Sequence, residues 1–242
     1  MFDHVTIRVT DRTRSELFYD SVLRALGVDQ SYRLGTYSEW QDFSLTEADG
    51  ANRPTRRLHL AFLSPSREQV DEFWRAGTER GYASDGEPGP RPQYGGKNYG
   101  AFLLDPDGNS TEAVHHGSPR RGGIIDHLWI RVGDLAAARR FYETIAPYAG
   151  LRLRDEQPNR VQFAGATGSF SLVPGTRTEN LHLAFPADDD ADVERFHQAA
   201  IEIGSQSHGP PGERPQYHPG YYAAYVLDPN GNNVEVVNHH RA

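Results

Sequence analysis

Histidine and glutamate recur at fixed intervals in this chain of 242 residues. One set has two imidazoles 55 residues apart and a carboxylate 53 residues further on, namely His4, His59 and Glu112. The same intervals return in a second set, His127, His182 and Glu235. Two imidazoles and one carboxylate are the ligands of a facial metal site that keeps open positions. Open positions let a metal act as a Lewis acid on a substrate oxygen or hold dioxygen.

The six residues lie in segments with the alternating pattern of β-strands. In residues 4–9 and 125–132 one face is apolar, and the other carries the first histidine of each set together with Thr6, Arg8, Trp129 and Arg131. The second histidine of each set lies inside an LHLAF segment, and each glutamate follows an Asp-Pro-x-Gly turn signal on the return strand of a hairpin. A polar face of this kind suits a ligand cleft, so Arg8, Trp129 and Arg131 are candidate substrate-binding residues.

The elements that must position these residues occur twice. An offset of 123 residues superimposes the sequence on itself from end to end, so the chain is a tandem repeat. Each copy contains two strand–helix–strands units, and the predicted helices cover residues 12–25, 66–80, 135–148 and 190–203. We expect one domain at 1–117 and another at 124–242, joined by a linker at 118–123 that is rich in Gly and charge.

Composition narrows the function classes. The formal net charge of −8 argues against nonspecific binding to nucleic acid or to an anionic membrane. The absence of cysteine excludes disulfides, thiolate metal sites and a cysteine nucleophile. No apolar run is long enough to span a bilayer, and the start of the sequence lacks the pattern of a signal peptide. We expect a cytoplasmic protein, monomeric or homodimeric, with a small-molecule substrate.

Three segments of each copy resemble the vicinal oxygen chelate superfamily, which includes glyoxalases, bleomycin-resistance proteins and extradiol dioxygenases. They are FDHVTIRV, LHLAF and YGAFLLDPDGNSTEAVHH, with the counterparts IDHLWIRV, LHLAF and YYAAYVLDPNGNNVEVV. The resemblance implies an α+β fold of two tandem domains, each with two paired βαβββ modules curled around a cleft. It also implies that the two His–His–Glu sets bind a divalent ion of Fe, Mn, Ni, Co or Zn.

Departures from the subfamily patterns limit the reaction type. Glyoxalase I has a fourth ligand on a strand where this chain has Ser44 and Ser171, although Asp42 could replace the first after a slip in register. Extradiol dioxygenases are matched by His218, Tyr225 and Glu235, but they also need an acid–base histidine, and residues 128–181 contain none. The potassium loop and phosphonate-binding cations of fosfomycin-resistance enzymes are not recognisable here.

Two functions therefore stay open: a divalent-metal enzyme of the glyoxalase or dioxygenase type, and a metal-free protein that sequesters a drug. For the enzyme, the candidate catalytic residues are Glu235, Tyr225 and His218, and the further candidate substrate-binding residues are Arg91, Arg214, Tyr94 and Tyr217. His115, His116, His239 and His240 are interpreted as surface residues. We expect each copy to close its own site, so that His4 joins His59 and Glu112, and we expect the second copy to be the active one.

Overall fold

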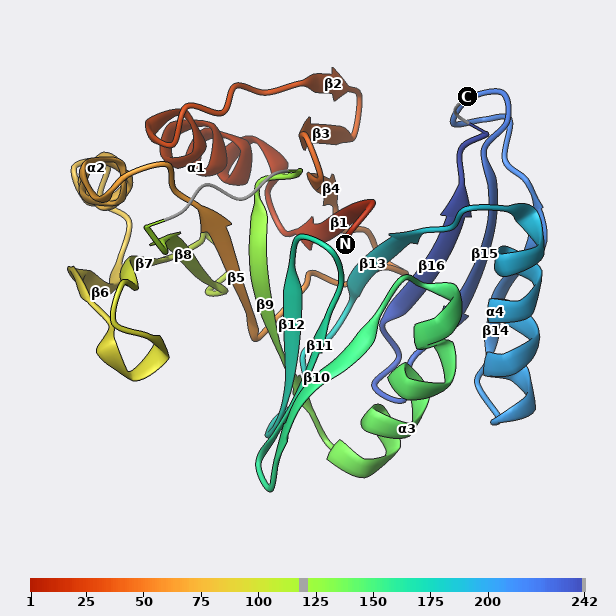
Figure 1. The fold of residues 1–242 in the computed structure, drawn as a ribbon. Coiled ribbons are helices and arrows are strands. Elements are labelled where there is room, and N and C mark those ends of the chain that lie inside the picture. The colour runs from red at the N-terminus through yellow and green to blue at the C-terminus, as the bar shows by residue number, and fades with distance from the viewer. Residues whose placement is uncertain (118–121, 241–242) are drawn as a thin grey trace. The chain divides into compact units, whose positions relative to one another are not determined.

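The computed structural model describes residues 1–117 and 122–240, which form four βαβββ modules in chain order (Figure 1). The first module comprises β1 (His4–Val9), α1 (Arg12–Ala25), β2 (Tyr32–Leu34), β3 (Tyr37–Trp40) and β4 (Phe43–Glu47). The second comprises β5 (Leu58–Leu63), α2 (Arg67–Thr78), β6 (Ser84–Pro90), a 3-10 turn (Pro92–Tyr94), β7 (Tyr99–Leu104) and β8 (Ser110–His115).

The second copy repeats this order. The third module comprises β9 (Ile125–Val132), α3 (Leu135–Ile145), a 3-10 turn (Ala146–Tyr148), β10 (Arg152–Gln157), β11 (Arg160–Ala164) and β12 (Ser169–Pro174). The fourth comprises β13 (Leu181–Pro186), α4 (Asp190–Glu202), β14 (Ser207–Glu213), β15 (Tyr222–Leu227) and β16 (Asn233–Asn238). The α+β class predicted from the sequence is confirmed. The predicted linker lies in part outside the described residues, at 118–121.

Each helix begins where a short polar side chain accepts a hydrogen bond from the backbone of the first turn, as Asp11 does from Arg14 and Ser66 does from Gln69. The predicted helix at 12–25 is confirmed to the residue. The predicted helix at 135–148 is three residues too long, because α3 ends at Ile145 and a 3-10 turn follows. Pro147 lies in that turn and has no N–H to donate to an α-helical hydrogen bond.

The strands form two eight-stranded mixed sheets. One has the order β14-β15-β16-β13-β1-β4-β3-β2 and the other the order β10-β11-β12-β9-β5-β8-β7-β6. The first module therefore shares a sheet with the fourth, and the second shares a sheet with the third. The expectation that each copy pairs its own two modules is wrong, because the first strand of each copy bonds to the second module of the other copy.

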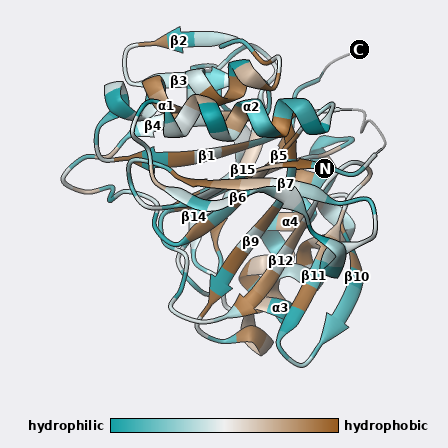
Figure 2. Ribbon diagram, turned by 90° about the vertical axis from the view of Figure 1, so that its left-hand side faces the viewer, coloured by the Kyte–Doolittle hydropathy of each residue, from teal (hydrophilic) through white to brown (hydrophobic). Residues whose placement is uncertain are grey.

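The described chain clusters into two compact units, one made of Met1–Thr6 with Ile130–Ala242 and the other of Ile7–Trp129. Each unit has its own aromatic core. In the second unit Tyr19, Phe43 and Phe62 pack together, and in the first unit Tyr142 packs against Phe170. Figure 2 shows apolar residues along strands such as β9 and β12, while the helices carry both apolar and polar residues. Within the described residues no helix is long and apolar enough to cross a membrane.

Candidate metal centres

Two groups of three ligand-type residues occur among the described residues. We call His4, His182 and Glu235 site 1. Glu235 Oε2 lies 3.0 Å from His182 Nε2 and 3.7 Å from His4 Nε2, and the two Nε2 atoms are 3.0 Å apart. The carboxylate side chain is 2% exposed, while each imidazole exposes about a fifth of its surface, 21% and 19%. The three ligand atoms therefore converge on one point that a small molecule can approach past the imidazoles.

We call His59, Glu112 and His127 site 2. Glu112 Oε2 lies 3.0 Å from His59 Nε2 and 3.5 Å from His127 Nε2. The ring centroids of the two histidines are 5.4 Å apart, against 5.1 Å for the two histidines of site 1. The two sites thus offer the same donor set in nearly the same arrangement. Each site lies wholly within one compact unit.

Three neighbouring strands bring each group together. Site 1 takes its residues from β16, β13 and β1, and site 2 takes its residues from β8, β5 and β9. The pairing β5–β8 is parallel and sets His59 opposite Ser110, so that Glu112, two residues further on, points to the same face. In β13–β16 the register sets His182 opposite Asn233, and Glu235 follows by the same rule.

The structure brings together all six predicted ligands but corrects how they pair. His4 does not join His59 and Glu112; it joins His182 and Glu235. The reason lies in the backbone, since Asp3 N–H donates to Ala184 O and holds the start of β1 along β13. In the same way Leu63 N–H donates to Ile124 O and holds the start of β9 along β5.

The repeated Asp-Pro-x-Gly hairpin fixes where each glutamate lies. Asp105 Oδ1 accepts from the N–H groups of Asp107 and Asn109, which closes the turn before β8. Asn109 then accepts from Leu58 N–H and donates to Thr55 O, so the start of β8 is locked to the start of β5. The second copy makes the same bonds through Asp228 and Asn232. The motif therefore sets the register that places Glu112 and Glu235.

Tyrosine side chains of helices α1 and α3 hold these turns by hydrogen bonds. The Tyr19 hydroxyl of α1 donates to Asp105 Oδ2 at 2.9 Å, and the Tyr142 hydroxyl of α3 donates to Asp228 Oδ2 at 3.2 Å. Burial, with the charge of the neighbouring aspartate, raises the pKa of both phenols far above the usual range. Both therefore stay protonated and act as donors.

Sequence reasoning missed the aspartates behind the first histidines. Asp3 Oδ1 lies 2.9 Å from His4 Nδ1, and Asp126 Oδ2 lies 2.8 Å from His127 Nδ1. A carboxylate that accepts from Nδ1 orients the ring and leaves Nε2 free for a metal. The signal was present in the sequence, because both copies carry Asp directly before this histidine.

Two histidines interpreted as surface residues extend these networks. His239 Nε2 lies 2.8 Å from Asp3 Oδ2, and His116 Nε2 lies 3.1 Å from Asp126 Oδ2. Both rings are half-buried. Burial acts to raise the Asp126 pKa, but hydrogen bonds from His116 and His127 outweigh it and hold the pKa well below the usual range. The interpretation of His116 and His239 as plain surface residues is therefore wrong.

The second histidines have neutral hydrogen-bond partners. Ser110 Oγ lies 3.2 Å from His59 Nδ1 and donates to Asp85, so its oxygen can accept from the imidazole. Asn233 Nδ2 lies 2.8 Å from His182 Nδ1, while the buried Asn233 Oδ1 has no hydrogen-bond partner among the described residues. If the Asn233 amide is rotated by half a turn, its Oδ1 accepts a hydrogen bond from His182 Nδ1–H. The lone pair of His182 Nε2 is then free to bind a metal.

Protonation states suit metal binding as well. Burial raises the pKa of Glu235, but the hydrogen bond from His182 and the charges of both histidines outweigh burial, and the net pKa is lowered. Burial, helped by the charge of His127, lowers the His59 pKa, although Glu112 opposes the shift. An ionised carboxylate and a neutral imidazole are the forms that ligate.

The spacing of the donors fits one ion per site. Ligand atoms about 2.1 Å from a metal lie about 3.0 Å apart at a right angle and about 3.4 Å apart at the tetrahedral angle. The separations from the carboxylate oxygen to the imidazole nitrogens, 3.0 and 3.7 Å in site 1 and 3.0 and 3.5 Å in site 2, fall near these values. Among the described residues neither group has a fourth carboxylate or imidazole. Asp42, considered as a substitute ligand, instead accepts from the N–H of Ile124.

The two sites differ in the rings around them. In site 2 the indole of Trp129 meets His59 edge-on at 6.4 Å, and Tyr94 meets Trp129 at 6.3 Å. Phe102 lies 5.9 Å from His59, and the Arg91 guanidinium lies over Phe102 at 5.2 Å. The structure thus gathers three predicted substrate-binding residues, Arg91, Tyr94 and Trp129, around site 2. Trp129 belongs to this site and not to site 1, where Tyr225 lies.

Site 1 has phenols where site 2 has Phe and Asn. Tyr225 takes the place of Phe102, lies 6.4 Å from His182 and has Arg214 over its ring at 5.5 Å. Its hydroxyl is buried and has no hydrogen-bond partner among the described residues. Tyr217, largely exposed, packs against Tyr221, whose hydroxyl donates to Glu235 at 2.6 Å. Tyr221 was not identified from the sequence.

Three predicted site residues lie outside this arrangement. His218 does not contact a ligand; its Nε2 lies 2.9 Å from His239 Nδ1, and three hydrogen bonds, through His239 and Asp3, separate it from His4. The backbone N–H groups of Arg8 and Arg131 donate to Thr55 and Thr178, and among the described residues neither guanidinium meets a ligand triad. The Arg131 side chain is exposed.

A hollow of about 590 Å³ lies elsewhere in the first unit. It runs between α3, the end of α4 and the turn from β15 to β16, and Arg140 and Arg177 border it. None of the predicted site residues lines this hollow. It is therefore not part of either site.

Comparisons with known proteins support the fold. Maize (Zea mays) glyoxalase I matches 98% of this chain over 92% of its own chain, with 21% identity and a TM-score of 0.70. A point variant of that enzyme gives 22% identity and a TM-score of 0.72 over the same shares. A Bacillus subtilis protein proposed to be a dioxygenase gives 15% identity and a TM-score of 0.68, with 100% of this chain and 86% of that chain covered.

These likenesses show the fold, and no curated protein matches the chain. The model of one family matches twice, at residues 1–113 and 124–236, an offset equal to the repeat of 123 residues found in the sequence. The two matches cover nearly all of the chain. The protein belongs to the Glyoxalase/Bleomycin resistance protein/Dioxygenase superfamily.

Proposed function

We propose that this chain is a divalent-metal enzyme that acts on a small molecule with two neighbouring oxygens. The observation that carries the proposal is the pair of buried carboxylates, each within 3.0 Å of an imidazole Nε2 whose Nδ1 has a polar partner. An ionised carboxylate is costly to bury unless it is paired or ligates a metal. Fe, Mn, Ni, Co and Zn all accept such ligands.

The bound ion would supply Lewis acidity, or a place for dioxygen, at open positions of the site. The surrounding residues would bind and orient the substrate. At site 1 the buried hydroxyl of Tyr225, beside Glu235, would donate to a substrate oxygen, and burial with the charge of Glu235 raises its pKa, so it stays protonated. Arg214, over the same ring, would favour a substrate with negative charge. We therefore assign catalysis to site 1.

Two types of reaction fit this proposal, that of a glyoxalase and that of a dioxygenase. Glyoxalase and dioxygenase chemistry both need bidentate binding of a substrate, and the donor sets of these two sites serve either. Ser44 and Ser171, at the strand where glyoxalase I carries its fourth ligand, are poor metal ligands, which disfavours a standard glyoxalase I. The absence of histidine from residues 128–181 disfavours a standard extradiol dioxygenase.

A metal-free binding protein is the second candidate. The aromatic group around site 2, with Trp129, Tyr94 and Phe102, favours it there, because planar rings bind drug-like molecules by stacking. A sequestering protein, however, has no need of the buried carboxylates. The amount of bound metal therefore distinguishes the metal enzyme from the metal-free binding protein.

The test is elemental analysis after reconstitution and exhaustive dialysis. We expect about two equivalents of metal in the parent protein, and none in the double variant Glu112→Ala, Glu235→Ala, since each site loses its charged ligand. The matched control is Glu79→Ala, Glu202→Ala, which removes two exposed carboxylates related by the same repeat offset and should keep both equivalents. A parent protein that retains no metal would contradict the proposal and favour the binding protein.

A further inference from the structure

The two buried glutamates are held differently. Glu235 turns Oε2 to His182 at 3.0 Å, and its other oxygen, Oε1, accepts from the Tyr221 hydroxyl at 2.6 Å. Glu112 also turns Oε2 to His59 at 3.0 Å. Among the described residues, however, Glu112 Oε1 has no donor. Site 1 therefore fixes both oxygens of its carboxylate, whereas site 2 fixes one.

Two differences between the copies explain this. The repeat offset aligns Tyr221 with Asn98, whose shorter amide side chain bonds to Tyr94 O and to His116. It also aligns Ala223 with Gly100. A Cβ added to Gly100 would lie 2.6 Å from Glu112 Oε1, so the position of that oxygen depends on the missing side chain.

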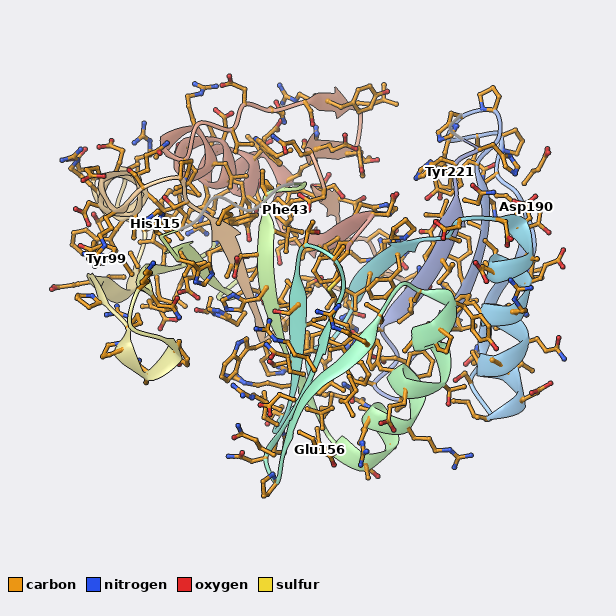
Figure 3. All side chains as sticks on the ribbon, in the orientation of Figure 1. Phe43, Tyr99, His115, Glu156, Asp190 and Tyr221 are labelled. Carbon is orange, nitrogen blue, oxygen red and sulfur yellow. The ribbon has the colours of Figure 1, made fainter. Side chains whose placement is uncertain are left out.

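Tyr221 is itself held in place. Its side chain is buried, and its ring lies edge-on against the stacked imidazoles of His218, at 5.2 Å, and His239, at 5.0 Å. His239 also bonds to Asp3, which orients the His4 ligand. Figure 3 marks Tyr221 at the start of β15, near the end of β16. One cluster thus supports two of the three site 1 ligands.

The Tyr221 hydroxyl acts as the donor in its contact with Glu235 Oε1, because an ionised carboxylate can only accept. A hydrogen bond to the oxygen that does not face the other ligands prevents rotation of the carboxylate. Because the Glu235 side chain is already ordered before the metal binds, binding loses less conformational entropy and is stronger.

We propose that Tyr221 is a positioning residue that makes site 1 the tighter of two divalent-metal sites, so that the chain loads site 1 first and site 2 second. The inference rests on the proposed function, because it needs both sites to bind metal. It goes further by ranking them and by naming the residue responsible. Site 2, whose carboxylate has one oxygen without a donor among the described residues, then exchanges metal more readily.

The first experiment compares single-site proteins by Zn²⁺ titration against a competing chelator. His59→Ala leaves site 1 alone, and His182→Ala leaves site 2 alone. We expect Zn²⁺ to bind the His59→Ala protein at least about tenfold more tightly, the lower end of the effect of outer hydrogen bonds on metal affinity. Equal affinities, or tighter binding by the His182→Ala protein, would overturn the ranking. Failure of both proteins to bind Zn²⁺ would instead overturn the proposed function.

The second experiment adds Tyr221→Phe to the His59→Ala protein. We expect Zn²⁺ affinity to fall about 10- to 100-fold. The control is Tyr222→Phe, which removes the neighbouring hydroxyl bonded to Glu194 on α4 and should leave the affinity unchanged. A merely structural role would lower the melting temperature of the metal-free protein but leave the Zn²⁺-induced rise intact; the proposal requires that rise to shrink. A Tyr221→Phe affinity within twofold of its parent would refute the role of Tyr221.

Discussion

Site 1 and site 2 have the same ligands and different supports. Both use two imidazoles and a buried carboxylate from three neighbouring strands, and both have an aspartate behind the first histidine. Around site 1 the supports are phenols and stacked imidazoles, whereas around site 2 they are an indole, a phenylalanine and an asparagine. The two copies therefore keep the same candidate ligands and differ in the residues that hold and surround them.

The aspartates offer the largest expected difference in stability. Each aspartate bonds to two histidines, but Asp126 is 1% exposed whereas the Asp3 side chain is 18% exposed. In the metal-free protein we expect Asp126→Ala to cost about 3 kcal/mol of unfolding free energy, since it removes a buried carboxylate and leaves two half-buried imidazoles without their partner. Asp3→Ala should cost about 1 kcal/mol. Urea denaturation measures both, and equal losses would show that the two networks are equivalent.

The turn anchors should behave alike. Tyr19→Phe and Tyr142→Phe each remove one hydrogen bond to a buried aspartate at the Asp-Pro-x-Gly turn. We expect each to cost about 1.5 kcal/mol, the range for bonds to charged groups. Thermal unfolding of the two variants provides the measurement. Costs that differ by more than about 1 kcal/mol would mean that the copies have diverged in their scaffold as well as in their sites.

A graft of the site 1 support into site 2 should give the smallest effect. Asn98→Tyr with Gly100→Ala supplies the phenol and the Cβ that site 1 has at these positions. In the His182→Ala background we expect Zn²⁺ affinity at site 2 to rise severalfold, less than the loss caused by Tyr221→Phe, because His218 and its ring stack have no counterpart at Gly95. Chelator competition would detect the change. Weaker binding in the graft than in Gly100→Ala alone would show that the phenol does not orient the carboxylate there.

The sequence was sufficient for the fold class and for the choice of six candidate ligands, whose metal binding stays a prediction. Strand parity and the repeat identified six residues that the structure brings into two groups, and the hairpin signal placed the two glutamates correctly. Local patterns specify these features, because alternation and turn residues act over a few positions.

The pairing of modules could not be read in this way. Both copies carry the same LHLAF strand, so no local sequence pattern predicts whether β1 pairs with β5 or with β13. Long-range strand order decides the question, and it reversed the expected partners of His4. Tyr221 was missed for a related reason: its role depends on a contact with Glu235 across the sheet, and the aligned residue in the other copy is Asn98.

The most direct test of the account is metal stoichiometry in two double variants that share His4→Ala. If His4 belongs with His182 and Glu235, then His4→Ala, Glu235→Ala damages one site only and should keep about one equivalent of Zn²⁺. His4→Ala, Glu112→Ala damages both sites and should keep none. The opposite result, with one equivalent retained by the His4→Ala, Glu112→Ala protein and none by the His4→Ala, Glu235→Ala protein, would contradict the exchanged pairing on which both sites rest.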